Sequence, residues 1–469
     1  MENKGSFRVE KDFLGSMNVP ADAYYGIQTL RAIENFPITG YRIHESLIVS
    51  MAMVKKAAAL ANAEVGLLDK KIGKYIAEAA TEIIEGKYHD QFLVDPIQGG
   101  AGTSINMNTN EVIANIALEK MGHKKGDYAV VSPNDHVNMS QSTNDAVPTA
   151  AHICILMLLD GLLDTMKKLR NTFAEKAKEH DPIVKMGRTH LQDAVPIRFG
   201  QELDAYAKVL DRDITRISAY GQCVNEVNIG ATAVGTGLNA YQFYIDAVIR
   251  ILKEISGFPV CQAESLVDAT QNTDCYTGVS SALKICAINI SKIANDLRMM
   301  ASGPRCGLFE INLPPRQPGS SIMPGKVNPV MPELVNQVAF QVIGNDHTIC
   351  LASEAGQFEL NVMGPVLIFN LIQSICIMNN TFRVFNEYCL KGITVNADRM
   401  RRYVYASVGT VTAVAPFIGY EKASQIAREA LDTGQTVRDL CLHYNVLTAE
   451  QLDEILDPFE MTRPRTEKI

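Results

Sequence analysis

One stretch of the sequence, residues 142–179, decides the fold class and reads STNDAVPTAAHICILMLLDGLLDTMKKLRNTFAEKAKE. The short polar side chains at its start suit the N-terminal cap of a helix, and Pro148 suits the first turn. Apolar residues then recur at spacings of three and four from Leu156 to Ala177, which predicts a helix ending near Glu179. With a rise of about 1.5 Å per residue this helix is roughly 50 Å long, more than one small domain covers. The stretch therefore predicts an elongated helical bundle.

Four further segments repeat this pattern over comparable lengths and predict the rest of the bundle: 200–227, 272–302, 331–356 and 365–390. Shorter helices are predicted near 45–65, 69–86, 421–433 and 448–456. Strand signal is confined to short pieces such as Ile183-Val184-Lys185. We therefore predict an all-α protein with three mainly helical domains: an N-terminal domain (1–140), a central helical bundle (141–396) and a small C-terminal helical domain (397–469).

Composition excludes several classes of protein. The chain has 469 residues, of which 47% are hydrophobic and 20% charged, a balance typical of a compact protein with a large core. Its formal net charge is -8, and no run of five like charges occurs, which argues against nucleic-acid binding. Asparagines and a proline interrupt the apolar segment 359–383, which is therefore interpreted as a buried helix and not as a membrane span.

The N-terminus is polar and lacks the pattern of a secretory signal, so a cytoplasmic location is expected. The 10 cysteines are scattered and form no C-x-x-C pair. Free thiols inside apolar helical patterns behave as small hydrophobic side chains. We expect a reduced protein without a structural zinc.

A glycine-rich loop late in the chain carries the first candidate site and reads Gly319-Ser320-Ser321-Ile322-Met323-Pro324-Gly325-Lys326-Val327-Asn328-Pro329. It presents two hydroxyls, an ammonium and an amide in a defined turn. A phosphate-binding loop needs four residues between its glycines and Ser or Thr after the lysine. Here five residues separate the glycines and Val327 follows Lys326. The alternative that the protein is a nucleotide-binding regulator therefore depends on an incomplete match to this motif. An ordinary surface turn would be more uniformly polar.

Three other segments group hydroxyl, amide and guanidinium donors: Gly187–Pro196, Asn138–Asp145 and Gly99–Asn108. The first contains His190, whose charge is easily tuned near neutral pH, although a lone histidine is more often structural. The second begins the long helix, where capping and anion binding use the same free N–H groups. The third lacks the G-x-G-x-x-G dinucleotide pattern. Together they suit a small polycarboxylate substrate and an electrostatically stabilised intermediate.

The Gly319–Pro329 loop resembles the signature of the aspartase/fumarase superfamily, which includes argininosuccinate lyase and adenylosuccinate lyase. The other three segments resemble the same family, as do Ala21–Gly26 and Ile418–Glu421, so the resemblance covers essentially the whole chain. It implies three mainly helical domains whose long central helices form the core of a homotetramer. It also implies active sites shared between subunits, each drawn from three copies.

Within the superfamily, the chain resembles the aspartase branch in three phrases: Gly102–Asn108, Asn138–Asp145 and Gln192–Arg198. Fumarases more often carry Gln, Lys, Ser and Thr at the positions of Ser104, Met139, Thr143 and Val195. Gly364 departs from the aspartase pattern, which has a charged residue there. The resemblance implies a carbon–nitrogen lyase that reversibly eliminates ammonia from L-aspartate to give fumarate. A class II fumarase, acting on malate, is the alternative.

The resemblance also implies roles for individual residues. Ser320 would take the Cβ proton of L-aspartate as an oxyanion stabilised by backbone N–H groups of its loop. Lys326 and Asn328 would bind the β-carboxylate as it becomes an enediolate-like aci-carboxylate. His190 would contact the substrate and be oriented by Glu333. The remaining substrate-binding residues would be Thr103, Ser142, Thr143, Asn144 and Thr189, with Arg31 a further substrate or structural contact.

No organic cofactor is implied. Some members of the family are activated by a divalent metal such as Mg²⁺, but the sequence shows no ligand cluster, so we predict no catalytic metal. The expected partners are a small-molecule substrate and further copies of the chain, without nucleic acid or membrane. An inert structural member, as lens crystallins related to argininosuccinate lyase can be, stays an alternative. Loss of Ser320, Lys326 or His190 would have favoured it, and all three are present.

Overall fold

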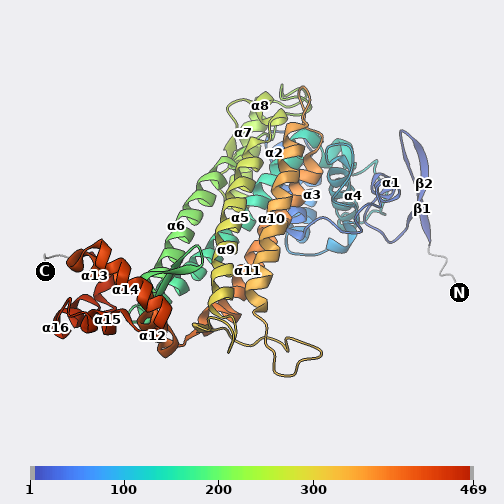
Figure 1. Ribbon diagram of the computed structural model, residues 1–469. Coiled ribbons are helices and arrows are strands. Elements are labelled where there is room, and N and C mark those ends of the chain that lie inside the picture. The colour runs from blue at the N-terminus through green and yellow to red at the C-terminus, as the bar shows by residue number, and fades with distance from the viewer. Residues whose placement is uncertain (1–5, 465–469) are drawn as a thin grey trace. The chain divides into compact units, whose positions relative to one another are not determined.

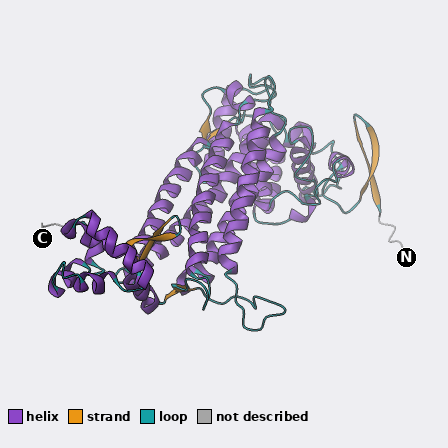
Figure 2. Cartoon of the chain, viewed as in Figure 1, coloured by secondary structure: helices purple, strands orange, loops and turns teal. Residues whose placement is uncertain are grey.

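In the computed structural model, which describes residues 6–464, helices dominate and strands are few and short (Figure 2). The long helices, labelled in Figure 1, are α5 (Thr143–Glu179), α6 (Phe199–Cys223), α9 (Asp274–Met300), α10 (Val330–Glu354) and α11 (Gly364–Tyr388). All five helices predicted from the apolar pattern are confirmed, and their ends shift by only a few residues. The predicted all-α class is therefore confirmed.

The shorter elements complete the chain. The helices are α1 (Ile27–Asn35), α2 (Glu45–Glu64), α3 (Lys70–Ile84), α4 (Thr103–Lys120), α7 (Gln242–Ser256), α8 (Leu266–Gln271), α12 (Ala397–Ala406), α13 (Val411–Ile418), α14 (Tyr420–Thr433), α15 (Val437–His443) and α16 (Ala449–Ile455). Antiparallel pairs join β1 (Phe7–Asp12) to β2 (Gly15–Pro20), β3 (Val184–Thr189) to β4 (Gln192–Arg198) and β7 (Ile311–Asn312) to β8 (Thr394–Val395). A short parallel pair joins β5 (Glu226–Val227) to β6 (Cys261–Gln262).

Helix α4 begins inside the donor-rich segment Gly99–Asn108, where the sequence analysis predicted no helix. The helix begins at Thr103, directly after Gly102, whose φ of 94° lies in the left-handed region. Every residue from Ile105 to Leu118 is buried, asparagines included. A helix buried on all sides shows no apolar stripe, so the 3.6-residue pattern that predicts amphipathic helices was absent here.

Contacts between residues group the described chain into two compact units. Unit 1 comprises residues 6–163, Thr215–Ile285 and Phe340–Met378, and unit 2 comprises Asp164–Ile214, Cys286–Ala339 and 379–464. Each of the five long helices therefore contributes residues to both units. This partition differs from the three predicted domains (1–140, 141–396 and 397–469), whose boundaries stay a prediction.

In unit 1, polar groups buried between helices supplement apolar packing. Asp346 on α10 accepts hydrogen bonds from Ser280 Oγ (2.8 Å) and Lys284 Nζ (2.6 Å), both on α9. On the same helix, Asn345 Nδ2 donates to Gln373 Oε1 (2.9 Å) and Ser374 Oγ (3.0 Å) of α11. Because a buried polar group is costly unless it is hydrogen-bonded, these pairs favour one alignment of neighbouring helices.

Unit 2 is built in the same way. The Tyr206 hydroxyl of α6 donates to Asp296 of α9 at 2.8 Å, and Asn336 Nδ2 of α10 donates to Ser291 Oγ of α9 at 2.8 Å. Phe173 of α5 is fully buried and lies edge-on to Tyr206, with ring centroids 5.8 Å apart. Aromatic packing and interhelical hydrogen bonds thus meet at Tyr206.

Three helical segments are long and apolar enough to cross a membrane by length and composition alone: Glu45–Glu64, Thr143–Glu179 and Gly364–Gly392. Between 61% and 72% of each apolar window is buried inside the protein. Packing against neighbouring helices therefore accounts for most of this apolar surface, as the interpretation of segment 359–383 expected.

Replacing Phe173 by Ala tests how much the aromatic contact with Tyr206 stabilises the bundle. We expect Phe173→Ala to lower the free energy of unfolding by about 3–5 kcal/mol, because it removes a buried ring and leaves a cavity. Urea unfolding followed by circular dichroism measures this change. The matched control is Phe13→Ala, since Phe13 is fully exposed, and its effect should stay within about 0.5 kcal/mol. Equal losses for both variants would contradict the assignment.

Candidate active site

A proline shapes the first turns of α5. Pro148 lies inside this helix and has no N–H to donate to the carbonyl of Asn144, four residues earlier. That carbonyl instead accepts a hydrogen bond from Asn228 Nδ2 at 2.9 Å. The Asn144 side chain donates in turn to the carbonyl of Ala233 at 2.8 Å. The loop 228–233 is therefore held against the start of α5 by groups that the helix itself leaves unpaired.

Asp145 completes this attachment. Its side chain is fully buried and accepts hydrogen bonds from the backbone N–H groups of Ser142 (2.9 Å), Gly230 (3.1 Å) and Thr232 (2.9 Å). Burial raises the pKa of Asp145 to about 6, although the backbone donors and Lys55 oppose the shift. One carboxylate thus fixes both the turn before α5 and the loop beside it.

The segment 138–143 is held from the other side by a buried lysine. Lys55 of α2 is fully buried, and its Nζ donates to Asn138 Oδ1 (2.9 Å) and Gln141 Oε1 (3.0 Å). Burial lowers the pKa of Lys55 to about 7, against the attraction of Asp145. Asn106 of α4 also donates to Asn138 Oδ1 (3.1 Å) and to Thr143 Oγ1 (3.2 Å).

These contacts bring four of the predicted substrate-binding residues into one region of unit 1. Ser142, Thr143 and Asn144 are consecutive at the start of α5, and Thr103 begins α4. A side chain at Gly102 would come within 3.0 Å of Val147 on α5, so the two helix starts pack closely. The exposed hydroxyl of Thr103 donates to the Gly100 carbonyl at 2.8 Å. Partly exposed hydroxyls and helix N-termini together suit a carboxylate.

The predicted residues Thr189 and His190 lie in unit 2, at the tip of the β3–β4 hairpin. Thr189 pairs with Gln192, so His190 and Leu191 form a two-residue turn. Both turn residues have left-handed φ angles, 56° for His190 and 60° for Leu191. Such angles are costly without glycine, on the order of 1–3 kcal/mol each, and persist only where the surroundings impose them. All three side chains from Thr189 to Leu191 are exposed.

Arg188 supplies the guanidinium of the segment Gly187–Pro196, which the sequence suggested as a hydrogen-bond donor to a substrate carboxylate. In the structure it already has a carboxylate partner. Its Nη1 donates to the buried Glu310 carboxylate at 2.8 Å, within unit 2. The Arg188 Nη1 is therefore engaged before any substrate binds, whereas the Thr189 hydroxyl and the His190 imidazole are exposed at the tip.

The loop around Ser320 supplies backbone donors to its hydroxyl. Ser320 Oγ accepts hydrogen bonds from the N–H groups of Ile322 (3.2 Å) and Met323 (3.0 Å). This is the arrangement that would stabilise a serine oxyanion. It requires a tight loop, and Gly319 allows one: a side chain there would meet the Lys326 carbonyl at 2.5 Å.

Lys326 and Asn328 differ in their surroundings. The Lys326 side chain is exposed, and its backbone carbonyl accepts from the Gly319 N–H at 2.7 Å. Asn328 Nδ2 donates to the Gly319 carbonyl at 2.7 Å, so its amide closes the loop in this structure. Direct binding of the β-carboxylate by Asn328 therefore stays a prediction, and it would use the second N–H of the amide, which this hydrogen bond does not engage.

Glu333 lies in the first turn of α10 and is half-buried. Within the described residues no hydrogen bond joins its carboxylate to the His190 imidazole, although both belong to unit 2. The predicted pairing of these two side chains therefore stays a prediction, and a single copy of the chain does not form it.

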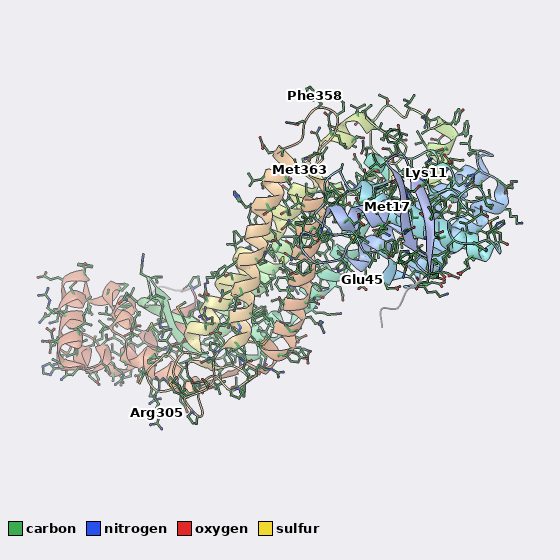
Figure 3. The ribbon with its side chains drawn as sticks, turned by 90° about the vertical axis from the view of Figure 1, so that its right-hand side faces the viewer. Lys11, Met17, Glu45, Arg305, Phe358 and Met363 are labelled. Carbon is green, nitrogen blue, oxygen red and sulfur yellow. The ribbon has the colours of Figure 1, made fainter. Side chains whose placement is uncertain are left out.

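The structure gives Arg31 a structural contact. Its guanidinium forms two hydrogen bonds to the Asp12 carboxylate, at 2.7 and 2.9 Å. Asp12 ends β1 in the N-terminal hairpin, on which Figure 3 labels Lys11 and Met17. The ion pair also lowers the pKa of Asp12. Arg31 thus connects α1 to this hairpin. Of the two roles predicted for it, a substrate contact or a structural contact, the structure shows the structural contact.

A cavity of about 590 Å³ lies beside Asn144 within unit 1. Its lining includes four carboxylates, Glu226, Glu264, Asp268 and Asp274, and also Gly364. A side chain at Gly364 would meet nothing within 4 Å, so the departure from the family pattern at this position leaves the packing intact. Across residues 6–464, no group of three or more His, Cys, Asp or Glu side chains is arranged to hold a metal ion.

Sequence reasoning missed the residues that support these turns. Lys55 was not singled out, and Asn106, Asn138 and Asp145 were named only as members of candidate segments, without roles of their own. One signal was available for Lys55: a lysine inside the apolar run 51–60 has to find polar partners once the helix is buried.

Comparison with known proteins identifies the family of this chain. Residues 15–344 match a family model described as "Lyase", and residues 411–463 match one described as "Fumarase C C-terminus". The first match covers most of the chain, and the chain belongs to this family of lyases, the aspartase/fumarase superfamily.

Individual relatives extend the match over nearly the whole length. A protein of Bacillus subtilis (strain 168) named "Aspartate ammonia-lyase" is 67% identical over 464 residues, which cover 99% of this chain and 98% of the relative. Among solved structures, a fumarate lyase:delta crystallin from Brucella melitensis bound to cobalt has a TM-score of 0.95, 45% identity and coverage of 98% and 100%. A class II fumarase from Schistosoma mansoni has a TM-score of 0.93, 34% identity and coverage of 97% and 99%.

Replacing the Asp145 carboxylate tests its role in the turn before α5. Asp145→Asn exchanges one acceptor oxygen for an NH₂ group, which leaves at least one of the three backbone donors unpaired. We expect a loss of about 1–3 kcal/mol in the free energy of unfolding for each unpaired donor. The control is Asp164→Asn on the same helix, whose side chain is 63% exposed and pairs with Lys168. This control should change stability by less than about 1 kcal/mol, and a similar loss in both variants would argue against the role.

The lowered pKa of Lys55 predicts a pH dependence of stability. The folded protein releases this proton near pH 7, whereas the unfolded chain holds it up to the ordinary value of 10.5. Because the unfolded state binds more protons in that window, this group makes stability rise with pH by about 1.4 kcal/mol per unit. We expect Lys55→Met to remove this rise in urea unfolding measured across the window, and Lys56→Met, one residue along α2, to keep it. Parallel curves for Lys55→Met and the parent would refute the assignment.

Proposed function

We propose that this protein is an aspartate ammonia-lyase, which reversibly converts L-aspartate to fumarate and ammonia. Membership of the superfamily supports an elimination that yields fumarate, and the relative at 67% identity carries the name aspartate ammonia-lyase. The fumarase alternative is not favoured, because the solved fumarase of Schistosoma mansoni is only 34% identical. An intact set of Ser320, Lys326 and His190 argues against an inert structural role.

The observation that carries the mechanism is the pair of backbone N–H groups on Ser320 Oγ. A serine hydroxyl is a weak base, and donors that lie about 3 Å from its oxygen stabilise the negative charge it needs. We propose that the Ser320 oxyanion removes the Cβ proton of L-aspartate. The electron pair of the broken C–H bond then moves into the β-carboxylate, which becomes an aci-carboxylate dianion.

Collapse of this intermediate completes the reaction. The electron pair returns to form the carbon–carbon double bond, the Cα–N bond breaks, and ammonia leaves fumarate behind. Lys326 is the cation in the Ser320 loop, and its exposed ammonium suits the extra negative charge of the dianion. Donors that act on charge present mainly in the intermediate lower the barrier more than donors that bind the substrate equally well.

The amino end of the substrate is assigned by charge. Thr103, Ser142 and Thr143 present hydroxyls that suit a carboxylate, whereas Asn144 borders the cavity with four carboxylates. A cation is favoured beside such a lining and a second anion is not. We therefore propose that Asn144 contacts the amino group of L-aspartate and the ammonia that leaves.

The site requires more than one copy of the chain in this proposal. Membership of the superfamily supports sites shared between subunits, and within the described residues of one copy no hydrogen bond joins Glu333 to His190. The exposed hairpin tip with His190 is free to complete the site of another copy. We propose a homotetramer in which three copies build each site and in which Glu333 of one copy orients His190 of another.

We propose that the protein is cytoplasmic and that its reaction requires no organic cofactor and no catalytic metal. Activation by a divalent ion such as Mg²⁺ would be a separate effect. The chemistry above needs only a base, a stabilised dianion and a cationic leaving group. Titration of the purified enzyme with a chelator and then with Mg²⁺ separates a required metal from an activating one.

Activity on two substrates tests the proposal. The purified protein is given L-aspartate or L-malate, and the ultraviolet absorbance of fumarate is followed together with ammonia. We expect fumarate and equal ammonia from aspartate, and little fumarate from malate. Fumarate mainly from malate would identify the protein as a fumarase. No fumarate from either substrate would favour the alternative of an inert structural protein.

Ser320→Ala tests the base. We expect its turnover of aspartate to fall by about 10²–10⁴-fold, the usual contribution of a proton-transfer group, without a change in thermal melting. The matched control is Ser321→Ala, because Ser321 is the neighbouring exposed serine and should keep most of the activity. Turnover of Ser320→Ala close to that of the parent would show that another group takes the proton.

A further inference from the structure

We propose that Glu310 is a positioning residue for this reaction: it holds the hairpin that presents His190 to the substrate. The inference rests on the proposed function of His190. It concerns a residue that lies away from the hairpin tip and contacts two cations of β3.

Glu310 contacts both cations of this strand. It is fully buried, and its Oε1 accepts a hydrogen bond from Arg188 Nη1 at 2.8 Å. Its Oε2 lies 3.3 Å from the Nζ of Lys185, which is itself buried. The register of the hairpin shifts between Met186 and Arg188, so one carboxylate spans the irregular part of the strand just before Thr189 and His190.

The carboxylate is itself held in place by its backbone. The Glu310 N–H donates to the Met300 carbonyl at the end of α9 (2.8 Å), and the Glu310 carbonyl accepts from the Asn396 N–H (2.9 Å). The preceding carbonyl of Phe309 accepts from Asn396 Nδ2 at 2.9 Å. Glu310 therefore cannot follow the hairpin if the hairpin moves, and the ion pairs fix the strand to the end of α9 and the start of α12.

A second carboxylate nearby does not duplicate this role. Glu202 of α6 accepts from Lys185 Nζ at 2.8 Å, but its side chain is 21% exposed and reaches no further along β3. Arg188 has Glu310 as its carboxylate partner, while its guanidinium lies 5.8 Å from the centre of the Tyr403 ring. Loss of Glu310 would leave Arg188 with this ring and the Met186 carbonyl, which accepts from Nη1 at 3.3 Å, but without a carboxylate beside the buried Lys185.

The imidazole depends on this arrangement for its orientation. Within residues 6–464 the His190 side chain forms no hydrogen bond, and it lies on a turn whose left-handed φ angles need support from elsewhere. Its position is therefore set through the backbone of β3 and β4. A shift of about 1 Å at a substrate-contacting group can cost about 10²-fold in rate. A displaced β3 strand would therefore lower the rate of the reaction.

Glu310→Gln tests the inference, because it keeps the shape of the side chain and removes its charge. We expect kcat/KM for L-aspartate to fall by about 10- to 100-fold. The matched control is Glu202→Gln, which removes the other carboxylate on Lys185 and should lower kcat/KM far less, because Arg188 keeps its hydrogen bond to Glu310. Equal kcat/KM values for the two variants would overturn the inference.

A double-mutant cycle with His190→Ala separates positioning from general damage. If Glu310 acts through His190, Glu310→Gln should lower kcat/KM in the parent but hardly at all in the His190→Ala background. Fully additive losses would overturn the inference. Should Glu310→Gln fail to fold in a thermal melt, Arg188→Lys replaces it in the cycle, with the same expectation. An inactive parent protein would refute the proposed function itself, which is a different outcome from an active parent with additive losses.

Discussion

A charged group enclosed by protein has to be matched by partners, and the carboxylate of Asp145 is the clearest case in this molecule. Three backbone N–H groups point at it, from the turn before α5 and from the loop 228–233. A side chain that accepts so many main-chain donors determines the path of two segments far apart in sequence. The hydroxyls of Ser142 and Thr143 are placed by this constraint, and so is the amide of Asn144. Glu310 has the equivalent position in unit 2, where a second fully buried carboxylate determines how His190 is presented.

Much of the architecture could be predicted because its helices are amphipathic. The spacing of apolar residues in α5, α6, α9, α10 and α11 follows from one buried face and one more polar face, so periodicity alone identified them. Helix α4 escaped because it is buried on every side. The β3–β4 hairpin was recognised only in part, since its turn carries His190 and Leu191 where a glycine or asparagine would have signalled a tight connection.

The residues of the site likewise fall into those that could be predicted from the sequence and those that could not. The Gly319–Pro329 loop could be recognised as a site because its residues are unusual as a set, and the structure adds two N–H groups on Ser320 that no pattern reveals. Glu310 could not be found from sequence, and for Lys55 the sequence showed only a lysine in an apolar run, without its partners. Their roles depend on burial and on partners from other helices and strands, and neither can be inferred from the neighbouring residues in the sequence.

The turn at His190 and Leu191 has a consequence for anyone who would engineer this protein. Selection for heat resistance alone would favour residues that enter the left-handed region freely, and Asn-Gly is the pair that such a turn prefers. That exchange would relax the hairpin and delete the imidazole in one step. Robustness and catalysis therefore compete at a single dipeptide, and variants chosen for durability should be screened for activity at this position before any other.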